Sequence, residues 1–148
     1  MGYSVETLGV DFLIPTENLE AAFTALKELN KRDDLKGGRA AGTRPDGSYG
    51  IIERYFAWMP ANYDETCKDA EEVFNELGFQ TSVDNEGLRV EWWIDNSSRG
   101  DEEHFFEAVA PFVKPGSYIE WEGEDYQRWR WDFDGKTMTE KTGTITWE

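Results

Sequence analysis

The segment Gly116–Glu148 constrains the fold more than any other part of the sequence, because aromatic and polar residues alternate strictly within it. After Gln127, every second residue up to Phe133 is aromatic, with arginines and an aspartate between them. A period of two is typical of a β-strand with one buried face. Gly123–Asp125 interrupts one predicted hairpin, and Asp134-Gly135 predicts a type I′ turn for the next, since both central residues of that turn need positive φ. The segment therefore predicts a β-meander with these side chains on its buried face: Trp129, Trp131 and Phe133.

Three segments have the hydrophobic spacing of amphipathic helices, which the aromatic face of the meander needs as a cover. They lie at about 17–30, 62–77 and 101–113. The middle helix is predicted to begin at Asn62, where Glu65 completes a capping box, and to end at Gly78. Alternating or short apolar runs predict further strands, at residues 7–14, 51–59, 79–83 and 88–94.

The order of these elements predicts the fold class. It is a single α+β domain over residues 1–148, with a mostly antiparallel sheet, three helices on one face, ferredoxin-like elements and a C-terminal β-meander. Within the strand at 88–94, alternation predicts a buried face that consists of Leu88, Val90, Trp92 and Ile94. It leaves Trp93 on the opposite face, where its ring is available for an interface.

The charge of the chain excludes some classes of function. Its formal net charge is −16, and residues 61–148 carry −14 of it, from 22 acidic and 8 basic residues. Such a charge excludes general binding to nucleic acids or anionic membranes and favours a protein partner with a basic surface. No apolar run approaches the roughly 20 residues of a membrane span, and no signal peptide is visible. With one cysteine and hence no internal disulfide, we expect a cytoplasmic protein.

Four carboxylates of the middle predicted helix are spaced by four, three and four residues: Glu65, Asp69, Glu72 and Glu76. Side chains three and four residues apart share a helix face, so these form an acidic stripe of roughly 16 Å at ~1.5 Å rise per residue. Duplex DNA carries one charge per ~1.7 Å of its axis, and the stripe is a sparser imitation of such a row of phosphates. The alternative is a solvated helix face, which is the usual role of charged runs.

The polar face of the meander is a second candidate interface. It is predicted to bring together Glu120, Glu122, Arg128, Arg130 and Asp132. One interpretation is a set of cross-strand ion pairs worth about 0.2–1 kcal/mol each. The other is a mixed-charge rim around Trp93 and Tyr126, since arginine and tryptophan are favoured interface anchors.

Residues 36–50 contain five glycines and a proline, and this composition predicts a flexible loop without regular structure. Within it, Arg39, Arg44 and Tyr49 form an alternative ligand site, in which backbone N–H groups and guanidinium groups clamp a nucleotide-like anion. The segment matches neither the P-loop nor the dinucleotide-binding motif. A mobile connector is the other interpretation.

Metal and nucleophile chemistry have little support in the sequence. Asp101, His104 and Glu107 have the i, i+3, i+6 spacing of one helix face, but one such motif lacks the further ligands that a metal needs. Cys67 lies on the predicted buried face of the middle helix, which favours a core residue. We therefore assign no catalytic residue, metal or cofactor and expect no enzyme. A metal-dependent hydrolase is the least favoured hypothesis.

Four motifs carry a resemblance to known sequences: Asp64–Phe79, Ala108–Tyr118, Gly123–Trp131 and Phe133–Lys136. With them the chain resembles a family of small uncharacterised proteins encoded by actinobacterial phages and prophages. The resemblance covers most of the chain and transfers no catalytic residue. It implies a phage-encoded accessory protein with a role in host interaction or anti-defence. The leading hypothesis is thus an inhibitor or nucleic-acid mimic that binds a host or defence protein through its acidic surface; the oligomeric state stays open.

Overall fold

The computed structural model of this protein describes residues 5–57, 59–93 and 101–143. Six strands form the main sheet: β1 (Val5–Pro15), β4 (Phe79–Val83), β5 (Gly87–Trp93), β6 (Tyr118–Gly123), β7 (Arg128–Phe133) and β8 (Met138–Gly143). Two more form a separate hairpin: β2 (Gly38–Thr43) and β3 (Tyr49–Tyr55). The helices are α1 (Leu19–Leu29), α2 (Tyr63–Thr66), α3 (Ala70–Leu77) and α4 (Glu102–Val109). Single 3₁₀ turns lie at Thr16–Asn18, Asp33–Leu35 and Ala110–Phe112.

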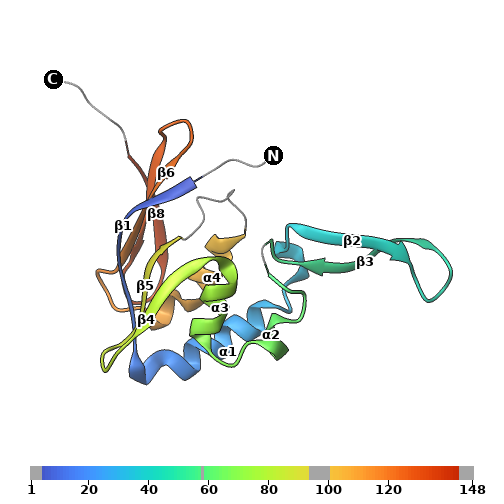
Figure 1. The fold of residues 1–148 in the computed structure, drawn as a ribbon, viewed down its shortest axis with the longest axis horizontal. Coiled ribbons are helices and arrows are strands. Elements are labelled where there is room, and N and C mark those ends of the chain that lie inside the picture. Colours follow the sequence, from blue (N-terminus) through green and yellow to red (C-terminus); the bar gives the residue numbers. More distant parts are fainter. Residues whose placement is uncertain (1–4, 58, 94–100, 144–148) are drawn as a thin grey trace.

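The main sheet has the order β4-β5-β1-β6-β7-β8 and every pairing in it is antiparallel. Helices α1, α3 and α4 lie against one face of it, and the β2–β3 hairpin projects from the other side of the helices (Figure 1). The α+β class and the C-terminal meander are thus confirmed, as far as Gly143. The ferredoxin-like elements are confirmed as well. In the order β4-β5-β1-β6, β5 lies between the parallel strands β1 and β4, and β1 lies between the parallel strands β5 and β6, so each βαβ unit is split by one antiparallel strand.

The core is a continuous cluster of aromatic rings between the sheet and the helices. Phe106 of α4 lies at its centre, with ring centroids 5.1 Å from Phe74, 5.1 Å from Phe79 and 5.5 Å from Trp131. The alternation of β7 is confirmed, since Trp129, Trp131 and Phe133 are all buried against these helices. Edge-to-face and offset contacts of this kind contribute about 0.5–1.5 kcal/mol each beyond the area that they bury.

Leu88 and Val90 are buried as predicted, but a β-bulge after Val90 reverses the predicted faces of the end of β5. Gln80 pairs with Trp92 but Thr81 pairs with Val90, so Glu91 is an extra residue opposite β4. One extra residue turns every later side chain to the other face. Trp93 is therefore buried, with 4% of its surface exposed, whereas Trp92 is 49% exposed. The predicted buried role of Trp92 and the exposed role of Trp93 are both wrong; Ile94 lies outside the described residues.

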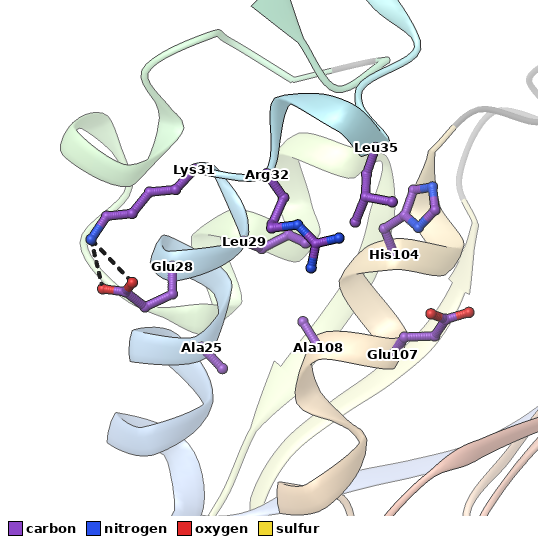
Figure 2. A pocket seen from close by; sticks show the side chains of 9 residues that line it. All are labelled: Ala25, Glu28, Leu29, Lys31, Arg32, Leu35, His104, Glu107 and Ala108. Carbon is purple, nitrogen blue, oxygen red and sulfur yellow. Dashed lines mark hydrogen bonds and ion pairs between the residues drawn. The ribbon is translucent and has the colours of Figure 1, made fainter.

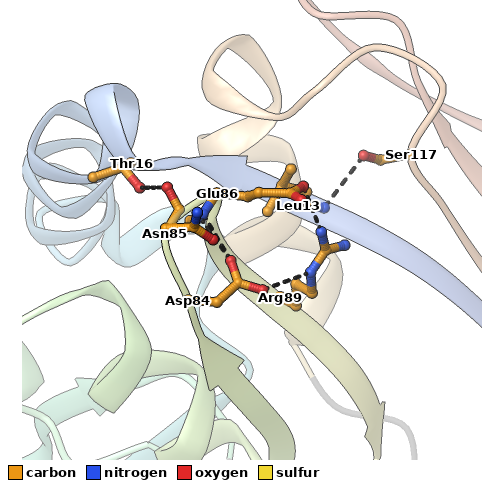
Figure 3. Close-up of polar contacts among 8 residues, drawn as sticks. Leu13, Thr16, Asp84, Asn85, Glu86, Arg89 and Ser117 are labelled. Carbon is orange, nitrogen blue, oxygen red and sulfur yellow. Dashed lines mark hydrogen bonds and ion pairs between the residues drawn. The ribbon is translucent and has the colours of Figure 1, made fainter.

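The tip of the β4–β5 hairpin is closed by polar contacts of its own and is hydrogen-bonded to Thr16, the residue after β1 (Figure 3). Asp84 Oδ1 accepts hydrogen bonds from the backbone N–H groups of Glu86 at 2.8 Å and Gly87 at 3.2 Å. The bond from Glu86 is the main reason that the pKa of the Asp84 carboxyl lies below its ordinary value; the bond from Gly87 and the nearby Arg89 add to the effect. Thr16 Oγ1 donates to the carbonyl of Asn85 at 3.4 Å. The start of the first helical segment is thereby tied to a hairpin that is distant in sequence.

The predicted helix over 62–77 is two helices, α2 and α3, with extended backbone at Cys67 between them. Its second part begins at a new cap: Asp69 Oδ1 accepts from Glu72 N at 2.9 Å, and Glu72 Oε1 accepts from Lys68 N at 2.7 Å. Asn62, the predicted cap, makes no side-chain capping bond. A reciprocal cap satisfies two otherwise unpaired N–H groups, which favours a fresh helix start over continuation of the first.

The glycine-rich segment is not a loop without regular structure, because residues 38–43 form β2. Its glycines provide flat backbone beneath large side chains from the partner strand: a Cβ at Gly38 would overlap the Tyr55 ring, and one at Gly42 would lie 2.8 Å from Ile52 Cδ1. Gly47 takes positive φ in the turn. Strand β3 ends at Tyr55, short of the predicted Met59. The mobility of the segment stays a prediction.

One predicted turn type also differs. In the β7–β8 connection only Gly135 has positive φ, as in a type II′ turn, and not both central residues as a type I′ turn requires. The Asp134 side chain stabilises this turn: its Oδ1 accepts hydrogen bonds from the backbone N–H groups of Lys136 at 2.8 Å and Thr137 at 2.7 Å. These bonds lower the pKa of the Asp134 carboxyl, and the bond from Thr137 has the larger effect.

Candidate functional site

Helices α2 and α3 carry the predicted acidic residues, which we call the acidic surface: Glu65, Asp69, Glu72 and Glu76. They do not form one regular stripe, because the chain is extended between the two helices. Asp69 and Glu72 hold the α3 cap, whereas Glu65 and Glu76 are exposed. Among the described residues none of the four forms an ion pair. Their negative charge is thus uncompensated at short range.

An apolar hollow of about 290 Å³ adjoins the acidic surface and shares Asp69 with it. We call it the α1–α3 hollow; it is lined by Leu19, Glu20, Phe23, Lys68, Asp69, Ala70, Glu71, Val83 and Leu88. Val83 at the tip of β4 is 54% exposed beside it. The sequence alone did not indicate this hollow, because its walls come from α1, the start of α3 and the β4–β5 hairpin. A hollow with an apolar floor and an acidic rim suits an apolar side chain flanked by basic residues.

The outer face of the meander carries compensated charges. Arg128 Nε lies 2.9 Å from Glu122 Oε2, and Arg130 Nε lies 2.8 Å from Asp132 Oδ1. Lys141 Nζ lies 3.0 Å from Asp132 Oδ2. Partial burial raises the pKa of the Asp132 carboxyl, but the hydrogen bonds from Lys141 and Arg130 outweigh it, and the net shift is downward. Arg128–Glu122 and Lys141–Asp132 are cross-strand ion pairs of the predicted kind, and Arg130–Asp132 is a pair within β7, so these side chains do not form a rim of available charges.

Trp93 does not lie with these arginines. Its ring is in the core, 5.2 Å from the Trp121 ring, on the helix-covered face of the sheet. Arg128 and Arg130 lie on the other face, where Arg130 stacks 4.0 Å above the Tyr118 ring. The predicted interface of Trp93, Arg128 and Arg130 is therefore not one patch. The aromatic side chain available at that end of the sheet is Tyr126, which is exposed in the β6–β7 turn.

The three residues of the alternative ligand site do not converge on one point. Arg44 folds back along the hairpin turn, where its guanidinium donates to Ser48 Oγ at 3.3 Å and the Ile51 carbonyl at 3.5 Å. Arg39 pairs with Arg54 near the base of the hairpin, and Tyr49 pairs with Thr43 near its tip. Four residues of strand separate the two pairs, which is roughly 13 Å. They cannot together clamp one small anion.

The residues of the suspected metal motif line different places. His104 and Glu107 are among the residues that line a groove of about 590 Å³ between α1 and α4, and Leu35 and Arg32 lie near His104 (Figure 2). Asp101 is engaged elsewhere, as described below. Within residues 5–57, 59–93 and 101–143, no three His, Cys, Asp or Glu side chains are placed to hold a metal ion. Burial, and then the charges of Glu76 and Glu72, raise the pKa of the Cys67 thiol, so it is a poor nucleophile at neutral pH.

Asp101 joins both ends of the β2–β3 hairpin to the start of α4. Its Oδ2 accepts hydrogen bonds from the backbone N–H groups of Gly37, just before β2, and Ala57, just after β3, each at 2.8 Å. Charge-assisted bonds to backbone N–H groups are the stronger class of hydrogen bond. This carboxylate therefore sets how the hairpin leaves the body of the protein.

We expect Asp101→Ala to speed amide hydrogen exchange across 38–55 and to lower the free energy of unfolding by about 1–3 kcal/mol, because two backbone donors lose their acceptor. Asp101→Asn keeps one acceptor oxygen and is expected to have a smaller effect. Exchange rates in β7 serve as the internal reference. Equal exchange of the hairpin in the Asp101→Ala variant and the wild type would show that the bonds do not hold it.

Comparison with models of protein families, with curated proteins and with solved structures finds no match. Among the described residues no helix is long and apolar enough to cross a membrane.

Proposed function

We propose that this is a phage-encoded accessory protein that binds a host or defence protein with a basic surface and inhibits it, with carboxylates standing where a nucleic acid has phosphates. The observation that carries the proposal is the contiguity of the acidic surface with the α1–α3 hollow through Asp69. Unpaired carboxylates attract a basic partner over a distance, and an apolar hollow gives the complex a desolvated anchor point. The phage source and setting are part of the proposal and rest on the resemblance of four sequence motifs to phage proteins.

The two parts of this surface have separate physical roles. Glu65 and Glu76 are exposed, so their attraction acts mainly on the association rate and weakens with salt, since the Debye length is about 10 Å at 0.1 M. The hollow acts at contact, where an apolar side chain of the partner leaves water. A partner that inserts such a side chain between lysines or arginines matches both parts.

We expect the double reversal Glu65→Lys with Glu76→Lys to slow association with the partner by on the order of tenfold or more at low salt. The partner is first captured from an actinobacterial host lysate and then purified. Association rates are measured between 25 and 500 mM NaCl, a range over which the Debye length falls from roughly 20 to roughly 4 Å. Asp69 and Glu72 are left unchanged, because reversing them would remove the α3 cap.

The matched control is Glu107→Lys with Glu124→Lys, which changes the net charge equally at exposed positions outside the acidic surface. If both double variants slow association equally, the effect is net charge and the acidic surface is not the interface. Val83→Asp tests the hollow separately, since an anchoring role predicts faster dissociation of the partner from this variant. Slower association without faster dissociation would contradict that role. Circular dichroism and thermal melting establish that each variant is folded.

A further inference from the structure

The β2–β3 hairpin, Gly38–Tyr55, forms a separate two-stranded sheet outside the main sheet, and we call it the arm. None of its residues belongs to the buried core. It projects away from the helices and the main sheet (Figure 1). A two-stranded hairpin alone is marginally stable in water. Contact with another surface would therefore stabilise the arm.

The strand register gives the arm two unlike faces. Directly paired residues share a face, and the pairs Arg39 with Arg54, Ala41 with Ile51 and Thr43 with Tyr49 lie on the same one. We call this the arginine face. Five of its six residues are exposed, all but Ile51, and Tyr49 is 76% exposed. It contains no carboxylate. The opposite face holds the glycines covered by Tyr55 and Ile52.

The charge of the arm is opposite to that of the rest of the chain. The arm has three arginines and two carboxylates, a net charge of +1, so the other 130 residues carry −17. Arg39 and Arg54 face each other directly, and like charges in that position repel. Neither forms an ion pair among the described residues. A carboxylate lying between them would relieve the repulsion.

We infer that the arginine face binds the acidic surface of a second copy of this chain. The complementarity is twofold. Two unpaired arginines meet the unpaired carboxylates Glu65 and Glu76, and the exposed Tyr49 ring matches the α1–α3 hollow, which adjoins the acidic surface at Asp69. Reciprocal exchange of arms about a twofold axis satisfies both copies and closes the assembly. The inference does not depend on the partner proposed above, although both would occupy the acidic surface and therefore exclude each other.

The length of the arm makes this contact possible between two strongly negative molecules. Strands of six or seven residues extend about 20 Å, which exceeds the Debye length of ~8 Å at physiological salt. The arginines thus act locally while the repulsion between the two bodies is screened. Self-association is expected to be strongest at intermediate salt, since very low salt leaves the body repulsion unscreened and high salt weakens the arginine contacts.

The test is sedimentation velocity of the full chain from 1 to 200 µM at 20, 150 and 600 mM NaCl, settings that place the Debye length at roughly 20, 8 and 4 Å. We expect a dimer at 150 mM NaCl and a dissociation constant at least tenfold higher for Arg39→Glu with Arg54→Glu. That reversal exchanges one like-charged pair for another, so the hairpin itself is little changed. The control Lys114→Glu with Lys136→Glu makes the same change of charge at exposed positions away from the arm and is expected to leave the dimer intact.

A charge exchange makes the test specific. The arm variant Arg39→Glu with Arg54→Glu and the surface variant Glu65→Arg with Glu76→Arg should each be monomeric alone and form a heterodimer when mixed, because both reciprocal contacts are then attractive. A monomeric wild type under all conditions, or no heterodimer, overturns the inference. So does an arm variant with unchanged mass that has lost binding to a 20-base-pair DNA duplex, since the arm would then serve a nucleic acid. If the surface variant Glu65→Arg with Glu76→Arg loses the dimer but associates with the partner at an unchanged rate, the proposed function alone is contradicted.

Discussion

Replacing Trp131 with alanine is expected to lower the free energy of unfolding by about 3–5 kcal/mol, as for other buried tryptophans. Its side chain is 1% exposed and packs between Phe106, at 5.5 Å, and Trp121, at 5.2 Å. Its Nε1 also donates to Glu140 Oε1 at 2.9 Å. The variant loses apolar burial and a hydrogen bond, and leaves a large cavity. Urea denaturation followed by far-ultraviolet circular dichroism measures the change.

Trp92→Ala is the matched control for this prediction. The two tryptophans lie on strands of one sheet, but Trp92 is 49% exposed on the face away from the helices. We expect its removal to change the free energy of unfolding by about 0.5 kcal/mol or less, as for most surface positions. A larger loss for Trp92 than for Trp131 would mean that the assignment of the sheet faces is inverted.

Gly87→Ala is expected to lower the free energy of unfolding by about 2–5 kcal/mol, with strain and overlap both contributing. Gly87 has a φ of +146°, and a Cβ there would overlap the backbone oxygen of Ile14 on the neighbouring strand. Backbone of a central strand cannot move aside as a flexible side chain can. The expected result is a lower denaturation midpoint and faster amide exchange at the β1–β5 pairing.

Gly116→Ala separates the cost of backbone strain from the cost of steric overlap. Gly116 also has positive φ, at +90°, but a Cβ there would meet nothing within 4 Å. Its replacement is expected to cost only the backbone strain, about 1–2 kcal/mol. If Gly116→Ala costs as much as Gly87→Ala, the contact with Ile14 contributes nothing and the argument from close approach is wrong.

The parts of the fold that follow from local sequence could be predicted, and the parts set by cross-strand contacts could not. The alternation of β7 and the helix end at Gly78 depend on a few adjacent residues, and both are confirmed. The reversal of Trp92 and Trp93 depends on how β5 meets β4, where Glu91 is the extra residue. No periodicity within β5 itself carries that information.

The glycine-rich segment failed as a prediction for a related reason. Glycine usually weakens a strand because it leaves backbone without side-chain packing. Here Tyr55 and Ile52 of β3 cover Gly38 and Gly42 of β2, so the packing comes from the other strand. The composition of the segment was visible in the sequence, but the register that places large residues over small ones was not.

The candidate site divides in the same way. The acidic residues were recognised from their spacing, although the competing cap at Asp69 and Glu72 breaks the helix that the spacing assumed. The α1–α3 hollow was missed, because it joins Phe23 and Val83, which are 60 residues apart in the sequence, across a helix and a hairpin tip. Only the fold brings such residues together.

The place of β1 in the sheet has a consequence for biosynthesis. β1 is paired on one side with β5 and on the other with β6, so that Val5 lies opposite Gly123. An amino-terminal strand that needs a partner more than a hundred residues away cannot complete its ladder while the ribosome is still making the middle of the chain. Proteins dominated by such non-local pairings fold on the slow side, in milliseconds to seconds. Until β6 emerges, one edge of β1 is open and the apolar faces of the helices lack most of their cover, which makes the nascent chain a ready client for chaperones of the cell that translates it.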